Sequence, residues 1–349
     1  VNAVGHNHPA LTKAITEQAA KLLHVSNLYW IEPQVKLAKL LVENSCSDKV
    51  FFANSGAEAN EGAIKLARKY AKEHYGEDKF EIITMNKSFH GRTLATLAAT
   101  GQSKFHQDFK PLPAGFKYVP FNDFKALEDA IGPHTCAVMM EPIQGEGGVY
   151  AAEPDYLTKV RRLCDDRNLL LIFDEVQSGI GRSGELFAYQ LYGVEPDIMT
   201  LAKGLGGGVP IGAFLAKEQV AAALKPGDHG STFGGNPLAT AAATAVLETI
   251  LADGFLAGVK EIAGYFATKL EELAAKYPVV KEVRGKGLLL GMELDVAAAG
   301  VVNGCREKGL LINGVAEKVL RFLPPLIITE ADVDEAVAIL AEELAKLSQ

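Results

Sequence analysis

The chain has 349 residues, of which 48% are hydrophobic, and it carries a formal charge of -8 with an isoelectric point near 5.6. This length exceeds that of one ordinary domain, so two domains are expected. The acidic balance, without a block of lysine and arginine, argues against binding to nucleic acid or to an anionic membrane surface. We therefore expect the partners to be small molecules or a second copy of the chain.

The spacing of the cysteines and the residues at the start of the chain give expectations about the cellular compartment. The four cysteines lie far apart and form no C-x-x-C pair, which predicts reduced thiols in a cytoplasmic protein. No apolar run approaches the ~20 residues of a membrane span, and no signal-peptide pattern opens the chain. The sequence starts VNAVGHNHPAL, without a methionine. We predict no metal site.

The first elements expected along the chain are a helix, an aromatic turn and a strand. Residues 11–25 have the apolar spacing of an amphipathic helix, and SNLYWIEPQ follows as a turn that ends where Pro33 starts a helix. Tyr29 in this turn is expected to be a packing or subunit-interface aromatic. Residues 50–53 predict a strand.

The segment NSGAEANEG after that strand predicts the start of a helix. Ser55 and Glu58 fit a capping box, which is a purely structural interpretation. The same geometry leaves the amides of Gly56 and Ala57 free at a helix N-terminus, where they can cradle a phosphate group. Both interpretations remain open at this point.

Two further apolar runs predict strands that end in polar segments. Residues 82–85 lead into NKSFHGR, in which Phe89 reads as a core residue. Arg92 is either a helix-surface arginine or a bidentate ligand for a carboxylate. Residues 136–140 lead into EPIQGEGG, where Glu141 and Glu146 both read as turn residues.

The stretch from residue 169 to residue 203 carries the most specific chemistry. Residues 169–173 and 198–202 read as strands buried on both faces of a parallel sheet, and they deliver Asp174 and Lys203 to the same sheet edge. A desolvated lysine amine can attack an aldehyde, and a fixed carboxylate can keep a pyridine nitrogen protonated, as pyridoxal phosphate requires. The following GLGGG is no Walker A loop, because the lysine precedes the glycines.

The rest of the chain predicts a smaller unit of helices and strands. Ser231 and Thr232 stand before a long helix, where hydroxyls usually act as caps. A helix is expected from residue 255 to about residue 276, followed by strands in VVKEVRGKGLLLGMEL, a helix, a strand at residues 319–323 and a final helix over residues 331–347.

The segment LLIFDEVQSGIGRSGELFAYQLYGVEPDIMTLAKGLGGGVPIGA resembles the cofactor signature of the class III (ornithine-type) pyridoxal-phosphate aminotransferases. The resemblance extends over essentially the whole chain. It implies an α/β fold of the type I pyridoxal-phosphate transferases. A large, mostly parallel-sheet domain would cover residues 33–253, and a smaller α/β domain would be built from residues 1–32 and 254–349. It further implies a cytoplasmic homodimer with shared active sites, and a chain that lacks the family's first segment.

The resemblance also implies a role for each cofactor-site residue. Lys203 would bind the aldehyde of pyridoxal phosphate and transfer the proton, while Asp174 would hold the ring nitrogen protonated. The loop of Ser55, Gly56 and Ala57 would bind the cofactor phosphate. Phe89 and Val176 would contact the two faces of the ring, and Gln177 would bond the ring hydroxyl. Thr232 would contact the phosphate of the cofactor in the neighbouring subunit.

For the substrate, the resemblance implies that Arg92 binds the α-carboxylate and that Ser231 lies nearby. Tyr29 would contact the distal end. Glu146 would pair with Arg321 and move aside for an acidic substrate, although a purely structural ion pair is an equal alternative.

The reaction so implied transfers an amino group between N-acetyl-L-ornithine and 2-oxoglutarate, giving N-acetylglutamate 5-semialdehyde and glutamate, as in arginine biosynthesis. Succinylornithine, ornithine and 4-aminobutyrate are alternative donors. An alternative of another class is a truncated chain that binds the cofactor without catalysis.

Overall fold

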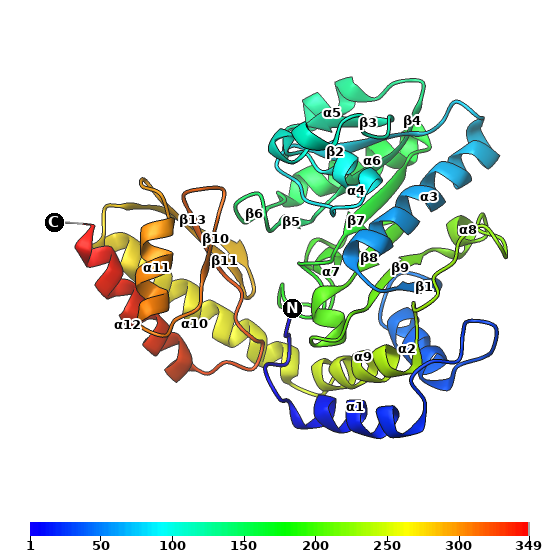
Figure 1. Ribbon diagram of the computed structural model, residues 1–349. Coiled ribbons are helices and arrows are strands. Elements are labelled where there is room, and N and C mark those ends of the chain that lie inside the picture. The colour runs from blue at the N-terminus through cyan, green and yellow to red at the C-terminus, as the bar shows by residue number, and fades with distance from the viewer. Residues whose placement is uncertain (348–349) are drawn as a thin grey trace.

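The structure is a computed structural model, which describes residues 1–347. Figure 1 shows two lobes: a larger one built around a seven-stranded sheet, and a smaller one built around a four-stranded sheet. The C-terminus lies at the outer side of the smaller lobe, while the first residues of the chain run between the two lobes. An α/β class with a mostly parallel large sheet is thereby confirmed.

The larger sheet positions the candidate site. Its strands, in spatial order, are β1 (Lys49–Ala53), β9 (Gly212–Ala216), β8 (Ile198–Leu201), β7 (Leu170–Asp174), β4 (Thr135–Met140), β2 (Glu81–Met85) and β3 (Phe116–Val119). All pairs are parallel except those of β9, which is antiparallel to both of its neighbours, so β1 runs in the same direction as β8. Every residue of β4, β7 and β8 is buried, as the unbroken apolar runs predict.

Helices cover the larger sheet on both faces. The longest is α3 (Gly56–Tyr75), which begins after Ser55, packs against β8 and β9 through its alanine-rich face and ends before Gly76. The others are α2 (Glu32–Glu43), α4 (Leu94–Ala99), α5 (Phe124–Ala130), α6 (Pro154–Arg167), α7 (Ala188–Tyr192), α8 (Glu218–Ala221) and α9 (Pro237–Ile250).

The smaller lobe has an antiparallel sheet with helices packed on it. Its strand order is β10 (Val280–Lys286), β11 (Leu289–Leu294), β13 (Val319–Phe322) and β12 (Asn313–Val315). The helices of this lobe are α10 (Phe255–Lys276), α11 (Ala299–Glu307) and α12 (Glu330–Lys346). A short hairpin of β5 (Ile143–Gln144) and β6 (Tyr150–Ala151) reaches from the larger lobe towards β10.

The first helix does not pack where the expected domain division puts it. Helix α1 (Pro9–Lys21) lies along α9, and a Cβ at Gly207 of the larger lobe would lie 2.7 Å from Leu11 Cδ2. In contrast, the amide of Leu326 donates a 2.7 Å hydrogen bond to the carbonyl of Ala3, so the first residues do contact the C-terminal part. The boundaries at residues 33 and 253 stay a prediction, and the contacts of α1 favour placing residues 9–32 with the larger domain.

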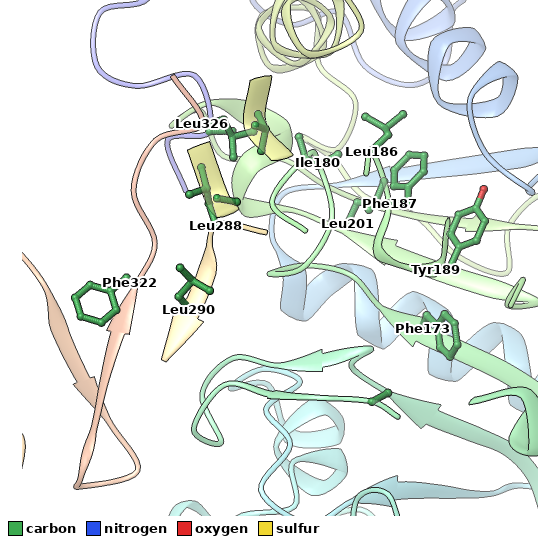
Figure 2. Close-up of a cluster of buried hydrophobic side chains, with 14 of the residues drawn as sticks. Phe173, Ile180, Leu186, Phe187, Tyr189, Leu201, Leu288, Leu290, Phe322 and Leu326 are labelled. Carbon is green, nitrogen blue, oxygen red and sulfur yellow. The ribbon is translucent and has the colours of Figure 1, made fainter. Parts of the chain in front are cut away.

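A continuous core joins the two lobes. Figure 2 shows apolar side chains from β7, from the segment that follows it and from the smaller lobe in one cluster; they include Phe173, Ile180, Leu186, Leu201, Leu288, Leu290 and Leu326. Arg182 fastens this junction, because its buried guanidinium donates to the carbonyls of Leu288, at 3.1 Å, and Pro324. Burial lowers the pKa of Arg182 to about 10.

Within residues 1–347, no single helix has the length and the apolar composition needed to cross a membrane. Helices α9 and α10 meet the criterion only when they are joined, and the pair bends by 72°.

Candidate active site

A cavity of about 440 Å³ opens at the carboxyl ends of the parallel strands. This is where open α/β sheets bind their ligands, because the loops that follow several strands meet there. The loops after β1, β2, β7 and β8 all contribute to its lining. Nine sequence-predicted residues line it together: Ser55, Gly56, Ala57, Phe89, Arg92, Asp174, Val176, Gln177 and Lys203.

Lys203 follows β8 directly and is the candidate nucleophile. Its backbone has a φ of +40°, in the left-handed region. Burial lowers the pKa of its amine, against the opposing effect of the carboxyl groups of Asp174, Glu141 and Glu146. A lowered pKa increases the neutral fraction of a lysine, which is the form that attacks carbonyl carbon.

Asp174 ends β7 and is only 3% exposed. Its Oδ2 accepts a hydrogen bond from Asn60 Nδ2 at 2.7 Å and lies 2.8 Å from His90 Nδ1, while its Oδ1 accepts from the amide of Val176 at 3.0 Å. These contacts hold both oxygens of the carboxylate in place.

Asn60 is a site residue that the sequence reasoning missed. Besides Asp174, its amide donates to the carbonyl of His90 at 2.7 Å, and its oxygen accepts from Thr200 Oγ1 at 2.7 Å. Asn60 thus fixes the positions of three loops or strands around Asp174. The signal available in the sequence is a polar residue on the alanine-rich, buried face of α3, where a side chain without a partner would be costly.

The start of α3 has the geometry of an anion cradle. Ser55 caps the helix, its Oγ accepting from the amide of Glu58 at 3.2 Å, while the Glu58 carboxylate accepts from the amide of Asn54 at 2.6 Å. A Cβ on Gly56 would lie 2.8 Å from Val176 Cγ1, so no side chain fits there. The first amides of the helix therefore remain available to a ligand.

Glu146 and Arg321 form the expected ion pair, which joins the two lobes at the site. Arg321 Nη1, from β13, lies 2.7 Å from Glu146 Oε1 and donates to Gln177 Oε1 at 2.9 Å. Burial tends to raise the pKa of Glu146, but the charge and hydrogen bond of Arg321 outweigh it and lower that pKa. Gln177 also donates to Glu146 at 3.3 Å, so these three side chains form one network.

Arg92 faces aromatic rings and no acid. Its guanidinium carbon lies 4.2 Å from the Phe105 ring centroid and 5.4 Å from that of Phe89. In the part of the chain that the structure describes, Arg92 makes no hydrogen bond or ion pair, and it is exposed. The rings orient the guanidinium while its donors stay open to a carboxylate.

Five sequence-predicted residues do not line this cavity: Glu146 and Arg321, which contact Gln177 at its edge, and Ser231, Thr232 and Tyr29. Ser231 and Thr232 line a separate cavity of about 610 Å³ beside residues 26–28 and 50–52. Ser231 Oγ accepts from Asn54 Nδ2 at 3.2 Å and from the amide of Gly234 at 3.0 Å. Tyr29 is 66% exposed, next to Trp30 at 94%. Within one chain, Ser231, Thr232 and Tyr29 therefore do not meet Lys203.

Comparison with known proteins agrees with this geometry. The sequence profile of the family described as "Aminotransferase class-III" matches residues 1–344. The chain is 60% identical, over 99% of its length and 88% of the relative's, to the acetylornithine aminotransferase of Caldanaerobacter subterraneus. It is 52% identical, over 97% of its length and 85% of the relative's, to the succinylornithine transaminase of Photorhabdus laumondii.

Solved structures resemble the chain in fold as well as in sequence. The ornithine aminotransferase of Toxoplasma gondii superposes with a TM-score of 0.95 at 35% identity, covering 99% of this chain and 85% of that one. The N-acetylornithine aminotransferase of Stenotrophomonas maltophilia gives a TM-score of 0.87 at 40% identity, covering 99% and 88%. With a family profile that matches nearly every residue, and with the expected lysine and aspartate in one cavity, this chain belongs to the class III aminotransferases.

Proposed function

We propose that the protein is a pyridoxal-phosphate-dependent aminotransferase that exchanges an amino group between N-acetyl-L-ornithine and 2-oxoglutarate. The observation that carries this proposal is the meeting of Lys203, Asp174 and an unpaired Arg92 in one cavity. Relatives named acetylornithine aminotransferase, at 50–60% identity over almost the whole chain, support the choice of substrate.

The residues present fit pyridoxal phosphate. The start of α3 offers amides and the Ser55 hydroxyl to a phosphate, in a cradle that a Cβ on Gly56 would fill. Phe89 and Val176 offer apolar surfaces to a ring, Gln177 a polar group, and Asp174 a carboxylate for a protonated ring nitrogen. When bound, the cofactor supplies an electron sink for the carbon that loses its proton.

Lys203 is the group that moves protons in this proposal. Its partly neutral amine would hold the cofactor through the cofactor's aldehyde group. A lysine amine that is not so engaged is a base, and it can take a proton from the substrate carbon that bears the nitrogen and carry it as an ammonium group. The crowded, buried surroundings that lower its pKa keep water away from this transfer.

Arg92 and Arg321 bind different carboxylates of the substrates in this proposal. Arg92, which has no anionic partner among residues 1–347, binds the α-carboxylate that both substrates share. Arg321 is neutralised by Glu146 while an acylated, uncharged tail occupies the pocket. When glutamate or 2-oxoglutarate binds, Glu146 moves aside and Arg321 binds the second carboxylate.

A homodimer in the cytoplasm completes the proposal. Large apolar side chains are exposed on the face near the second cavity, among them Leu28 at 81%, Trp30 at 94% and Phe233 at 62%. An exposed patch of this kind favours association with another protein surface. Each subunit would then supply Tyr29, Ser231 and Thr232 to the site of its partner.

Complementation tests the shared site. Lys203→Ala and Thr232→Glu subunits, each inactive alone, should regain activity when unfolded together and refolded, because a mixed dimer rebuilds one intact site. Activity that stays absent, although mixed dimers form, would contradict the shared site.

Absorbance spectroscopy tests the reaction. Pyridoxal phosphate added to the protein should give a new visible band that is absent from Lys203→Ala. N-acetyl-L-ornithine should bleach this band, and 2-oxoglutarate should restore it. If N-succinyl-L-ornithine, L-ornithine or 4-aminobutyrate bleaches the band more readily than N-acetyl-L-ornithine does, the proposed substrate is wrong. If no band forms, the proposed role of Lys203 is wrong.

A further inference from the structure

Two carboxyl groups lie side by side at the floor of the site, and the proposed function uses only one of them. Met140 and Phe173 are partners in the pairing of β4 with β7, so Glu141 and Asp174 leave these parallel strands as neighbours. Both are buried, with 6% and 3% of their surface exposed. Glu141 also lines the cavity, although its sequence context suggests only a turn residue.

The surroundings of the two carboxyl groups differ. Asp174 is bonded by the side-chain amide of Asn60, the ring of His90 and the amide of Val176. Within residues 1–347, Glu141 accepts one hydrogen bond, from the amide of Phe89 to Oε1 at 3.1 Å. Two neighbouring buried carboxylates repel each other, and Asp174 has more hydrogen-bond donors around it than Glu141 has.

Two polar atoms in this cluster complement each other. Oε2 of Glu141 and Nε2 of His90 are both buried, and neither has a hydrogen-bond partner within residues 1–347. Ligand atoms of Glu141, His90 and Asp174 lie within 4.8 Å of one another. In the tautomer of His90 that carries its proton on Nδ1 and donates it to Asp174, Nε2 is an acceptor. That acceptor needs a donor, and Glu141 is a donor only if it is protonated.

We propose that Glu141 is a buried, protonated carboxylic acid that donates through one water to His90 Nε2. His90 then keeps its own proton on Nδ1 for Asp174. Glu141 is thus a positioning residue: it fixes the tautomer of His90 and leaves Asp174 as the negative charge available to a protonated ring nitrogen. Only this last consequence rests on the proposed function, because the proton on Glu141 is a property of the chain alone.

The electrostatics of the other facing groups agree. Burial raises the pKa of Glu141 well above its usual value, and the charge of Asp174 raises it further. The amide of Phe89 and the amine of Lys203 act in the opposite direction, and Glu146 adds to the increase. Together these effects favour the protonated form of Glu141.

A bound cation is the competing interpretation of the same three residues. A metal ion would need both carboxylates ionised and a free nitrogen on His90. The existing contacts oppose this, because Asn60 and Val176 direct N–H donors at the oxygens of Asp174 that an ion would use.

Infrared difference spectroscopy on the cofactor-free protein tests the proposal. The spectrum of the wild type minus that of Glu141→Gln should contain a carbonyl band of a protonated carboxylic acid at pH 8, with the small shift in deuterium oxide that an exchangeable proton causes. The matched control is Glu146→Gln, which removes an ion-paired carboxylate and should leave that band in place. If Glu141→Gln removes a carboxylate band instead, or if stoichiometric metal is found and a chelator alters the spectrum, the proposal is overturned.

Cofactor affinity gives a second measurement. Glutamine keeps a neutral donor, so Glu141→Gln should bind pyridoxal phosphate within about threefold of the wild type, whereas Glu141→Leu leaves His90 Nε2 unpaired and should weaken binding about tenfold. Equal weakening in both variants would overturn the role as a donor. If the wild type fails to bind pyridoxal phosphate, the proposed function fails, while the infrared result still decides the proton on Glu141.

Discussion

Asn60 and Asp174 are joined by a 2.7 Å hydrogen bond between Nδ2 and Oδ2 that neither sequence position alone would indicate. The bond ties α3, whose first turn is the anion cradle, to the end of β7, which holds the carboxylate. Both side chains are almost wholly buried. In the proposed function, this one amide holds the phosphate end and the ring end of the cofactor site in a fixed relation.

Removing this amide should weaken cofactor binding. Asn60→Leu preserves most of the volume but takes a donor from the carboxylate, so the dissociation constant of pyridoxal phosphate should rise about 10- to 100-fold. Fluorescence titration of the cofactor-free protein measures this constant. Thr200→Val, which removes only the hydroxyl bonded to the Asn60 oxygen, should have a smaller effect. Unchanged affinity in Asn60→Leu would refute the structural importance of the bond.

Replacing Arg92 should impair both half-reactions. Because the α-carboxylate is common to both substrates, Arg92→Leu should lower kcat/KM for N-acetyl-L-ornithine and for 2-oxoglutarate by about 10- to 100-fold each, while the visible cofactor band is kept. Arg162→Leu, an exposed arginine on α6, is the matched control and should leave steady-state kinetics unchanged. A loss confined to one substrate would contradict the shared carboxylate site.

Neutralising Glu146 should shift substrate preference towards diacids. In Glu146→Gln, the Arg321 side chain, which is 6% exposed, loses its carboxylate partner. A substrate with a second carboxylate can then pair with Arg321 and should bind more tightly than a substrate with an uncharged tail. The ratio of kcat/KM for glutamate to that for N-acetyl-L-ornithine should rise about tenfold. Glu293→Gln also breaks an arginine ion pair of the smaller lobe, with Arg284, and serves as the control. A ratio that moves equally in both variants would argue that the Glu146 pair is only structural.

The buried Glu175 should make stability depend on pH. Burial raises the pKa of this group from 4.5 to about 7, although its hydrogen bonds with the amides of Ala188 and Tyr189 oppose the shift and the Asp174 charge adds to it. A folded-state pKa above the unfolded value means that the folded protein holds the proton more tightly. The stability that Glu175 gives the folded protein by binding this proton is therefore fully present below about pH 4.5, and it is lost as the pH rises through 7.

Urea unfolding of the cofactor-free wild type and of Glu175→Gln at pH 5 and pH 8 measures this effect. The stability of the wild type relative to the variant should fall between these pH values by at most about 3 kcal/mol. The hydrogen bond altered by glutamine is independent of pH and cancels in the comparison. The exposed Glu195 gives the control, since Glu195→Gln should show a flat difference. A wild-type advantage that grows with pH would show that Glu175 is ionised in the folded state.

The parts of the site that the sequence predicted are those set by strand ends. The apolar runs that end at Asp174 and Lys203 are β7 and β8, which are neighbours in the sheet, so two carboxyl ends meet at one edge. Ser55 reaches the cavity two residues after the end of β1, in the same way. Phe89 stands four residues after β2, and its place was expected only from the family resemblance.

Contacts between distant segments were beyond the sequence. Asn60 and Asp174 are 114 positions apart, and periodicity shows only that α3 has a buried face, without showing what it meets. The same limit applies to α1, whose amphipathic pattern does not reveal that it packs on α9. Glu141 was read as a turn residue because its burial depends on the neighbouring β7 and on the loop of Phe89.

The backbone of Lys203 has one more consequence. At a φ of +40°, a residue with a Cβ is strained by about 1 kcal/mol, whereas glycine adopts this conformation freely. Lys203→Gly should consequently give a protein that is inactive yet unfolds at a higher temperature than the cofactor-free wild type. The fold thus tolerates a locally unfavourable residue at the position whose chemistry it needs, and greater robustness is available to it only by giving up catalysis.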